Sequence, residues 1–590
     1  MTYDQTVIFS LFGAVFLLLL WGRFRYDLVA LTALIAGVIL GVVPKDIAFS
    51  GFGHPATIIV AFVLVVTAGL VRSGAVYLIT QKFVDTTRSL PSHIAFMGVI
   101  GGVLSAFMNN VAALALLLPV DVQTAQKAKR AVGLSLMPLS FATILGGMAT
   151  LVGTPPNIII SSFREQALGE PFSMFDFAPV GGSVALVGIA FVALIGWKFI
   201  PVRSKDTADA KPENQYIAEL TIPKESKLIG ERLSALNEVA ESCDVALLGI
   251  IREGKRLYGS AQNRRLEAQD AIVLEALPNA LDEFRTSLAL DFSDEKREAL
   301  LTAEGDGLSL SEAVVTENSR VNGKSVETVG LAWRKGAILM GVSRNGKRIT
   351  ERLRKLTLLP GDILLLLSQK DRAEDVLNWL KVLSLADTGT KLTANSKTTL
   401  AIILFAAAIL SSAIGLIYLP IALGLLIVLY VLTGILDITT LYDHIEWPVI
   451  VLLGSMIPLG LALENSGGTA LLADLLLRLT QGQETWVVLT VLMIVTMTLS
   501  DVLNNTATTI VAAPVSLHLA EQLNVSPDPF LMAVAISASA AFLTPIGHKN
   551  NTIILGPGGY KFSDYWRTGL PLEILIVAVS IPLLLIFWPL

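Results

Sequence analysis

One polar motif occurs twice in this chain, once in each half, both times inside an otherwise apolar stretch. The copies read SAFMNNVA at 105–112 and SDVLNNTA at 500–507, and each runs on to a Pro-Val pair. Apolar segments interrupted at matching places in two halves are typical of secondary transporters, because each interruption ends one half-helix and starts another near the middle of the bilayer. The repeat therefore predicts a membrane protein built from two related halves that moves a solute.

The composition also indicates a membrane protein. Hydrophobic residues make up 53% of the 590 residues and charged residues 16%, and apolar runs of roughly 18 residues, long enough to span a bilayer, recur. The first run, 7–20, has no basic region before it and no cleavage site after it, so we expect a retained membrane helix rather than a signal peptide. A net charge of -5 gives no reason to expect a nucleic-acid partner.

The apolar runs predict a helical polytopic membrane protein with five spans and one re-entrant hairpin in each half. The hairpins are expected at 93–120 and 486–517, because two neighbouring amides facing lipid are costly and the chain can avoid this by turning at the Asn pair. An odd number of spans per half implies that the halves form inverted repeats. The spans are expected near 7–24, 26–43, 55–71, 131–160 and 178–199, and near 398–416, 419–436, 447–463, 529–556 and 570–589.

The loop charges predict an orientation, since short cytoplasmic loops collect Lys and Arg. With the N-terminus outside, basic residues such as Arg25, Arg72 and Arg88 fall inside, whereas Lys45 and Arg164 fall outside. This orientation places both termini outside and the region between the halves in the cytoplasm. The N-terminus does not resemble a transit peptide, so we expect a plasma membrane or a bacterial inner membrane.

Between the membrane halves, 1–203 and 397–590, the chain has a soluble pattern that is itself doubled. IIREGKR at 250–256 recurs as VSRNGKR at 342–348, and QDAIVL at 269–274 recurs as GDILLL at 361–366. Asn345-Gly346 between β-type runs predicts a tight hairpin. We expect two small α/β modules, at 216–285 and 308–381, with polar linkers at 204–213 and 387–396.

This tandem insert resembles the RCK-C (TrkA-C) module of potassium-transport regulators. The likeness rests on a helix start after Gly230 and Gly323, on the Arg-x-Gly-Lys-Arg hairpin and on the Gln-Asp or Gly-Asp start of a strand. No Gly-x-Gly-x-x-Gly fingerprint precedes either copy, so the nucleotide-binding half of such regulators is not expected. The resemblance implies a regulatory role with an unknown cytosolic ligand.

The membrane halves resemble the divalent anion:sodium symporter family of the ion-transporter superfamily. GMATLVGTPPN at 147–157 is close to its Thr-Pro-Pro-Asn signature, and TPIG at 544–547 with GPGGY at 556–560 resembles its sulfate-permease-like branch with paired RCK-C modules. The resemblance implies homodimers that work by an elevator movement. It also implies a Ser-Asn-Thr triplet at each hairpin tip that holds sodium and anion. The triplet falls on 109–111 and 504–506, where both serines and the first threonine are replaced.

A site in the middle of the membrane follows from these residues. A half-helix start offers free N–H groups to an anion, and an Asn amide can donate to an anion while its carbonyl coordinates sodium. Alternatively, the Asn pairs only satisfy backbone groups and the broken spans are plain kinks. The expected substrate contacts are Asn109, Asn110, Asn504, Asn505, Thr506, Thr154, His548 and Lys549. The expected sodium contacts are Asn110, Gly153, Asn157, Asn505, Gly547 and Asn551.

Three charged residues have more than one interpretation. Lys549 could pair with the anion, take the place of a second sodium, or extend its stem to a cytoplasmic vestibule. Asp501 could bind a proton or sodium, although we expect it in the aqueous rim of the hairpin. Glu573 is expected to be an interfacial charge at a span end.

The sequence therefore predicts a sodium-coupled symporter of sulfate or another small inorganic or organic anion. An enzyme is not expected, because the chain has no zinc, phosphate-loop or Ser/His/Asp pattern, and no cofactor beyond the coupling ion is expected. The alternatives are a di- or tricarboxylate symporter, a sodium/proton antiporter that uses Asp501, and a sulfur-status sensor that signals through the insert and transports little.

Overall fold

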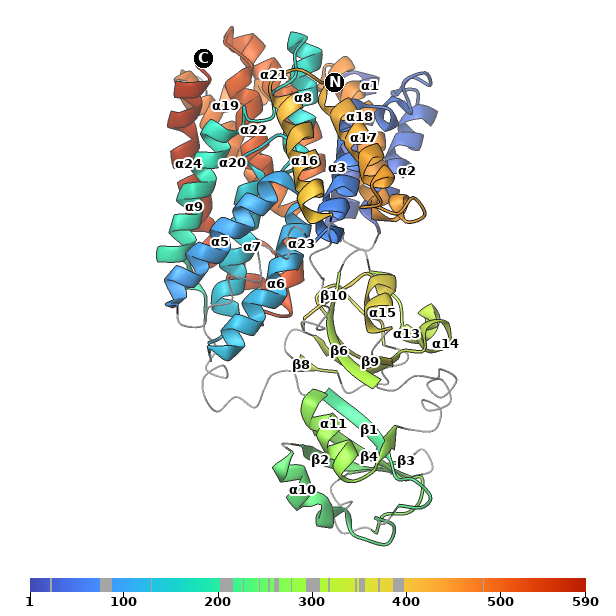
Figure 1. Cartoon of the computed structure of the whole chain (residues 1–590). Helices are drawn as coiled ribbons and strands as arrows, with labels where there is room; N and C mark the ends of the chain where they lie inside the picture. Colours follow the sequence, from blue (N-terminus) through green and yellow to red (C-terminus); the bar gives the residue numbers. More distant parts are fainter. Residues whose placement is uncertain are drawn as a thin grey trace.

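The structure is a computed structural model of the chain, in which a bundle of helices stands beside two small sheets (Figure 1). Both termini lie at the end of the bundle farthest from the sheets. The predicted linkers at 204–213 and 387–396 and the turn at Asn345-Gly346 lie outside the described residues. The structure describes residues 1–21, 24–74, 88–128, 130–201, 216–226, 228–243, 245–252, 255–258, 265–276, 278–292, 308–316, 319–344, 347–349, 356–369, 372–385, 397–480 and 482–590.

The helices of the first half begin and end at residues that favour helix boundaries. Pro55 and Pro155 occupy first turns, where a missing N–H is tolerated, and α8 ends at Gly169 with a φ of 82°. The helices are α1 (Tyr3–Trp21), α2 (Tyr26–Ile39), α3 (Pro55–Arg72), α5 (Leu90–Phe107), α6 (Asn110–Lys127), α7 (Gly133–Gly147), α8 (Pro155–Leu168) and α9 (Ser183–Leu194), with short turns η1 (Ser50–Phe52), η2 (Ala178–Gly182) and η3 (Gly196–Phe199).

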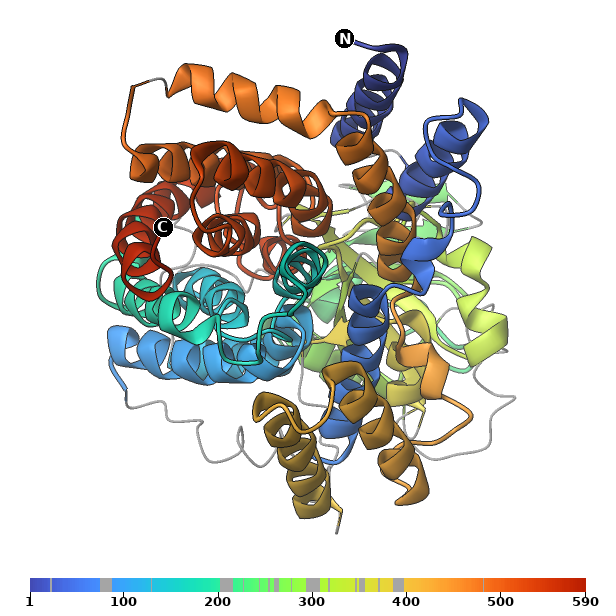
Figure 2. The ribbon, with the colours of Figure 1, turned by 90° about the horizontal axis from the view of Figure 1, so that it is seen from above.

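The described helices of the second half follow a similar order, and one of them was not predicted from the sequence. The residues at the corresponding place in the first half, 75–87, lie outside the described residues. The unpredicted helix, α19, starts after Gly467, which has a φ of 72°, and it crosses the edge of the bundle (Figure 2). Its 12 residues include Asp474 and Arg478, so its pattern differs from that of a span. The helices are α16 (Thr398–Ala413), α17 (Leu419–Leu432), η7 (Leu441–His444), α18 (Trp447–Asn465), α19 (Gly468–Leu479), α20 (Thr485–Val502), α21 (Asn505–Leu523), α22 (Asp528–Ser539), α23 (Lys549–Leu555), η8 (Phe562–Asp564) and α24 (Tyr565–Phe587).

Among the described residues, five helical stretches are long and apolar enough to cross a membrane, and seven shorter helices are also apolar. The chain is therefore a mostly helical protein with several membrane spans. The predicted spans 131–160 and 529–556 are each two helices, α7 with α8 and α22 with α23, separated by an unwound stretch. The five stretches are Ser50–Arg72, Leu90–Phe107, Trp447–Asn465, Thr485–Val502 and Phe562–Phe587.

The helices form two groups (Figure 2). The hairpin group consists of α5–α9 and α20–α24 and contains both hairpins and both broken helices. The flanking group consists of α1–α3 and α16–α18. The groups meet where α3 contacts α8 and where α18 contacts α21, and α19 joins them along one edge. This division places every expected site residue in the hairpin group.

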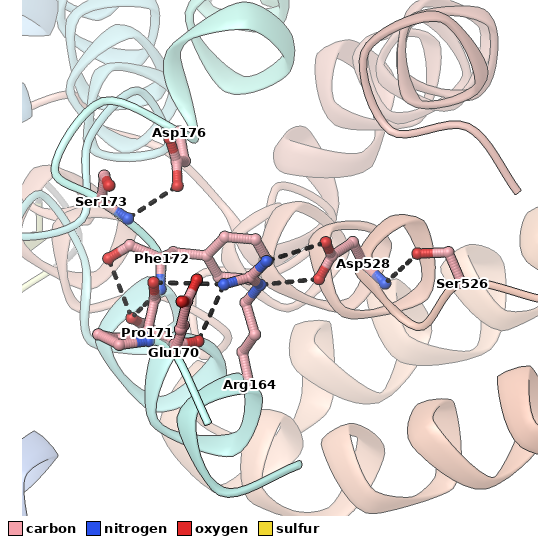
Figure 3. Close-up of polar contacts among 9 residues, drawn as sticks. Arg164, Glu170, Pro171, Phe172, Ser173, Asp176, Ser526 and Asp528 are labelled. Atoms are coloured by element: carbon pink, nitrogen blue, oxygen red, sulfur yellow. Dashed lines mark hydrogen bonds and ion pairs between the residues drawn. The ribbon is translucent and has the colours of Figure 1, made fainter. Parts of the chain in front are cut away.

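An ion pair ties the two halves of the chain together at the far end of α8 (Figure 3). Arg164 donates from Nε and Nη2 to the two carboxylate oxygens of Asp528, at 2.8 and 3.2 Å, and from Nη1 to the carbonyl of Glu170 at 2.9 Å. The ring of Phe172 lies 4.7 Å from the guanidinium carbon. Such a two-pronged pair fixes geometry as well as charge, so α8 is held against the start of α22.

The insert forms two five-stranded antiparallel sheets that share one strand order. In the first sheet the order is β3-β2-β4-β1-β5. In the second sheet, read from the corresponding edge, it is β8-β7-β9-β6-β10. In Figure 1 the second sheet lies nearer the helices. The strands are β1 (Tyr216–Thr221), β2 (Ala246–Arg252), β3 (Lys255–Tyr258), β4 (Ala271–Ala276), β5 (Asp291–Phe292), β6 (Leu308–Val315), β7 (Ile338–Arg344), β8 (Lys347–Arg348), β9 (Ile363–Gln369) and β10 (Val382–Ser384).

The repeated Arg and Asp of the insert form the same ion pair in both sheets. Arg252 donates to both carboxylate oxygens of Asp270 at 2.9 and 2.7 Å, and Arg344 donates to those of Asp362 at 2.7 and 2.7 Å. Both aspartates are buried, and a buried carboxylate needs a charged partner. The sequence repeat is thus explained by a turn that each sheet fixes before its central strand.

Candidate functional site

The first Asn of each hairpin pair starts a helix. Asn109 accepts the N–H of Val111 at 2.9 Å, and Asn504 accepts the N–H of Ala507 at 2.8 Å. A side-chain oxygen at this position satisfies one of the free N–H groups of the first turn. Both residues therefore cap α6 and α21, and their amide groups remain half-buried at the hairpin tips.

The second Asn of each pair differs between the halves. Asn110 is 5% exposed, accepts the hydroxyl of Ser105 at 2.7 Å and lies 3.3 Å from Nε2 of His548. Gly147 leaves it room, since a Cβ there would lie 2.4 Å from the Asn110 side-chain oxygen. Asn505 is half-buried, and no hydrogen-bond partner for its amide is found in the described parts of the chain. Among the described residues, the amide of the second Asn therefore has protein partners at the first tip and none at the second.

Asn157 and Asn551 brace the two unwound stretches in the same way. The side-chain nitrogen of Asn157 donates to the carbonyl of Thr150 at 2.8 Å, and that of Asn551 donates to the carbonyls of Ala541 and Thr544 at 3.1 and 3.3 Å. The side-chain oxygen of Asn551 also accepts the hydroxyl of Ser140 at 2.9 Å. Both residues hold unwound carbonyls in place, as a cation site at these carbonyls would require.

Hydroxyl groups attach each unwound stretch to a hairpin. Thr150 donates to the carbonyl of Ala106 at the end of α5, and Thr544 donates to the carbonyl of Asp501 at the end of α20. Because a hydrogen bond fixes both of its partners, each hairpin tip and the unwound stretch beside it form one unit.

Two expected site glycines allow close backbone approach. A Cβ on Gly153 would lie 2.3 Å from the carbonyl oxygen of Gly147, and one on Gly547 would lie 2.9 Å from the Cα of Asp501. Thr154, which precedes α8, is 1% exposed and its hydroxyl has no partner among the described residues. Thr506 is buried in the first turn of α21.

The start of α23 connects the second broken helix to the first hairpin. Nδ1 of His548 accepts the N–H of Asn550 at 3.1 Å and so caps α23. The side-chain nitrogen of Asn550 donates to the carbonyl of Asn110 at 3.1 Å and to the hydroxyl of Thr143 at 2.8 Å. Asn550 was not predicted as a site residue, although it precedes Asn551 and occupies the position that Pro156 has in the first copy. Its side-chain oxygen is fully buried, with no partner in the described residues.

Lys549 links the hairpin group to the flanking group. Its ammonium donates to Glu446 at 2.9 Å and lies 5.7 Å from the ring centre of Tyr26. Glu446 precedes α18 and Tyr26 begins α2, so the ammonium lies against the flanking group. In this conformation Lys549 pairs with a carboxylate of the protein, and its contact with an anion stays a prediction.

The expected positions of Asp501 and Glu573 were wrong. Asp501 is 2% exposed and accepts the N–H of Leu543 at 2.9 Å, and Glu573 is 6% exposed and accepts the N–H of Phe542 at 3.2 Å. The unwound stretch before α23 folds over the end of α20, and α24 packs beside it, so both carboxyl groups are buried rather than in a rim or at an interface. Their donors are consecutive N–H groups, which brings the two carboxyls together.

Paired hairpins, broken helices and a bundle of membrane helices define a secondary transporter, and the chain is not an enzyme. It belongs to the citrate transporter family, CitMHS, whose family profile matches residues 16–509 and 470–590. This assignment lies within the ion-transporter superfamily that the sequence predicted.

Three relatives of the chain are named as transporters. An uncharacterized transporter of Synechocystis sp. is 30% identical over 98% of this chain and 96% of its own length, and one of Escherichia coli is 28% identical over 99% of both. Sodium/sulfate cotransporter 2 of Chlamydomonas reinhardtii is 26% identical over 54% of this chain and 38% of its own length.

Proposed function

We propose that the chain is a sodium-coupled symporter of a small divalent anion, with sulfate as the favoured substrate. The observation that carries the proposal is the start of α21, where the half-buried amide of Asn505 has no hydrogen-bond partner among the described residues. The N-terminus of a helix attracts anions through its free N–H groups, and the amide can donate one more hydrogen bond. The carbonyls braced by Asn157 and Asn551 supply the oxygens that sodium prefers.

The two halves act, in this proposal, as inverted repeats within a homodimer. The similar helix order of the halves supports the repeat, and the separation of the hairpin group from the flanking group supports an elevator movement in which the hairpin group slides. The termini face outward and the insert faces the cytoplasm of a plasma or bacterial inner membrane. The insert acts as a pair of RCK-C modules, and the equivalent Arg–Asp ion pair in each sheet supports this role.

Sulfate and carboxylates compete as substrates of such a site, since both present oxygens with negative charge to N–H donors. The name of the Chlamydomonas reinhardtii cotransporter supports sulfate, and the description of the family supports a citrate-like carboxylate. The substitution of both tip serines and of one threonine reduces the hydroxyl donors available to a larger substrate, which favours sulfate.

Uptake into proteoliposomes tests this function. Radiolabelled sulfate and radiolabelled citrate are offered separately, each with an inward sodium gradient, with a proton gradient, and with neither. We expect sulfate uptake that depends on the sodium gradient. Uptake of citrate alone would identify the carboxylate symporter, and an absence of uptake of both anions by well-folded protein would contradict the proposal.

The buried carboxyl pair supports a second candidate for the coupling ion. Two adjacent carboxyl groups in a poorly solvated site do not both ionise easily, because each charge disfavours the other. Asp501 and Glu573 could therefore hold a proton during the cycle. Uptake driven by the proton gradient, and lost in Glu573→Gln, would support proton coupling over sodium coupling.

A further inference from the structure

The second module of the insert touches the half-helix that carries site residues. A Cβ on Gly556, which directly follows α23, would lie 2.1 Å from the carbonyl oxygen of Gly361. A Cβ on Gly361 would lie 3.5 Å from the carbonyl of Thr552. The two backbones are therefore in direct contact. The other end of α23 begins at His548, beside the first hairpin tip, so one short helix separates the module from the site.

The turn that makes this contact is held firmly by its own sheet. Asp362 accepts hydrogen bonds from Nε and Nη2 of Arg344 and, at 2.8 Å, from the N–H of Leu359. The N–H of Gly361 donates to the carbonyl of Val315 at 2.9 Å. Because the turn is tied to the strands on both sides, it can move only together with the module. A change in the module would therefore be transmitted to α23.

The first module provides an internal comparison. It builds the same turn around Gln269, whose φ of 68° is close to the 86° of Gly361 and whose N–H donates to Ile222 at 2.9 Å. Figure 1 shows this module farther from the helices. The turn geometry thus does not require glycine, and the close approach depends on the missing side chain of Gly556.

The second module also lies close to the flanking group. Burial lowers the pKa of His444, in the turn η7, and the positive charges of Arg72 and Lys381 lower it further. Lys381 belongs to the second module, directly after α15 (Ala373–Leu380). Two residues after His444, Glu446 holds Lys549 of α23. The module therefore lies near both groups of helices at the side that faces the sheets.

We propose that the second module is a clamp that regulates transport by holding the end of α23 against the flanking group. The proposal rests on the proposed function, because it assumes that the hairpin group moves relative to the flanking group. While the turn at Gly361 contacts Gly556, α23 is held in place. Release of the turn, for instance by a change in the module, frees the hairpin group to move.

The variant Gly556→Ala tests the clamp by steric exclusion, since its methyl group cannot fit against the Gly361 carbonyl. We expect uptake of radiolabelled sulfate, or of citrate if that is the anion carried, to rise about fivefold in proteoliposomes, the lower range of common coupling energies. The matched control is Gln269→Gly, which alters the same turn in the first module and should leave uptake unchanged. Unchanged or slower uptake in folded Gly556→Ala would overturn the proposal.

A reversible cross-link tests the opposite state and does not depend on that variant. Gly361→Cys and Thr552→Cys are combined in a Cys243→Ala background, with each single cysteine as a control. We expect oxidation to reduce uptake at least about fivefold and reduction to restore it. Equal uptake by oxidised and reduced protein would overturn the clamp and leave the proposed function intact. A chain that carries neither anion in either state would instead contradict the proposed function.

Discussion

The starts of the two half-helices α8 and α23 occupy corresponding places in the halves and differ in almost every side chain. The first reads TPPN at 154–157 and the second HKNN at 548–551. Only the last Asn is shared, and in both copies it donates to carbonyls of the unwound stretch. The two prolines have no N–H and make no polar side-chain contact, whereas His548 and Asn550 both contact Asn110 of the first hairpin and Lys549 pairs with Glu446 beside α18.

This difference shows that one residue holds the unwound stretch in place, whereas other residues connect the half-helix to its neighbours. The shared Asn maintains the unwound geometry, so either sequence can break a span. The other residues of the second copy connect α23 to the first hairpin, to the flanking group and, through its far end, to the second module. The far end of α8 is instead fixed by the pair Arg164–Asp528. We therefore expect α23 to be the half-helix at which transport is controlled.

The largest effect is expected from Asn505→Ala, which removes the half-buried amide at the second hairpin tip. Because this amide is not used by described protein groups, its loss should remove a ligand contact and lower anion uptake on the order of 100-fold, equivalent to about 2.7 kcal/mol. Thermal stability should change little. The measurement is initial uptake in proteoliposomes, with the melting temperature of the detergent-solubilised protein as a control for folding.

Asn110→Ala is the matched variant at the first tip. It leaves the hydroxyl of Ser105 and Nε2 of His548 without a buried partner, which costs about 1–3 kcal/mol for each group. Stability should therefore fall together with uptake. Normal uptake by Asn505→Ala, or an equal loss of stability in both variants, would contradict the assignment of different roles to the two amides.

The next effect concerns Lys549, whose partner in this conformation is Glu446. If the lysine leaves Glu446 to meet the anion during the cycle, Lys549→Gln should raise the KM about tenfold, equivalent to about 1.4 kcal/mol. Glu446→Gln should act in the opposite direction and lower the KM, because it releases the ammonium. Measurements of the KM of both variants test whether Lys549 contacts the anion. Equal KM values in wild type and both variants would remove Lys549 from the substrate site.

Features set by local sequence were predicted well. The helices of each hairpin meet at the Asn pairs, and the predicted spans break at Gly153 and Gly547. Each of these depends on residues close together in the chain, such as an Asn that caps a helix or a proline that cannot continue one.

Features set by distant partners could not be predicted. Asp501 and Glu573 are buried because α24 and the unwound stretch meet over the end of α20, and Lys549 finds Glu446 from another group of helices. No spacing rule relates residues so far apart in sequence. Asn550 was overlooked for the same reason, since its partners Asn110 and Thr143 belong to the other half. The short charged helix α19 was missed because it does not have the pattern of a span.

A smaller effect is expected from Arg164→Ala, which tests how the far end of α8 is held. The side chains of Arg164 and Asp528 are 18% and 14% exposed, so loss of one partner should cost less than the 3–5 kcal/mol of a fully buried pair, about 2 kcal/mol. The melting temperature should fall, while the KM of the remaining folded protein stays close to that of wild type. Arg164→Lys should recover part of the stability, because it restores the charge but not the two-pronged geometry. A large change in KM at unchanged stability would instead place this pair in the substrate cycle.

The smallest effect is expected from Val111→Thr, which gives the first tip the hydroxyl that Thr506 has at the second. Val111 is half-buried, and its N–H already donates to Asn109, so the added hydroxyl does not replace a missing hydrogen bond of this N–H. Burying part of this hydroxyl should cost about 1 kcal/mol of stability or less, and uptake should stay within about twofold of wild type, a change below 0.5 kcal/mol. The reverse change, Thr506→Val, removes a hydroxyl at the tip that we propose binds the anion and should reduce uptake more strongly. Initial rates measured at several sodium concentrations compare the two variants. If Val111→Thr altered the sodium dependence as strongly as Thr506→Val, the first tip would also bind sodium, and the proposed asymmetry would apply to the anion alone.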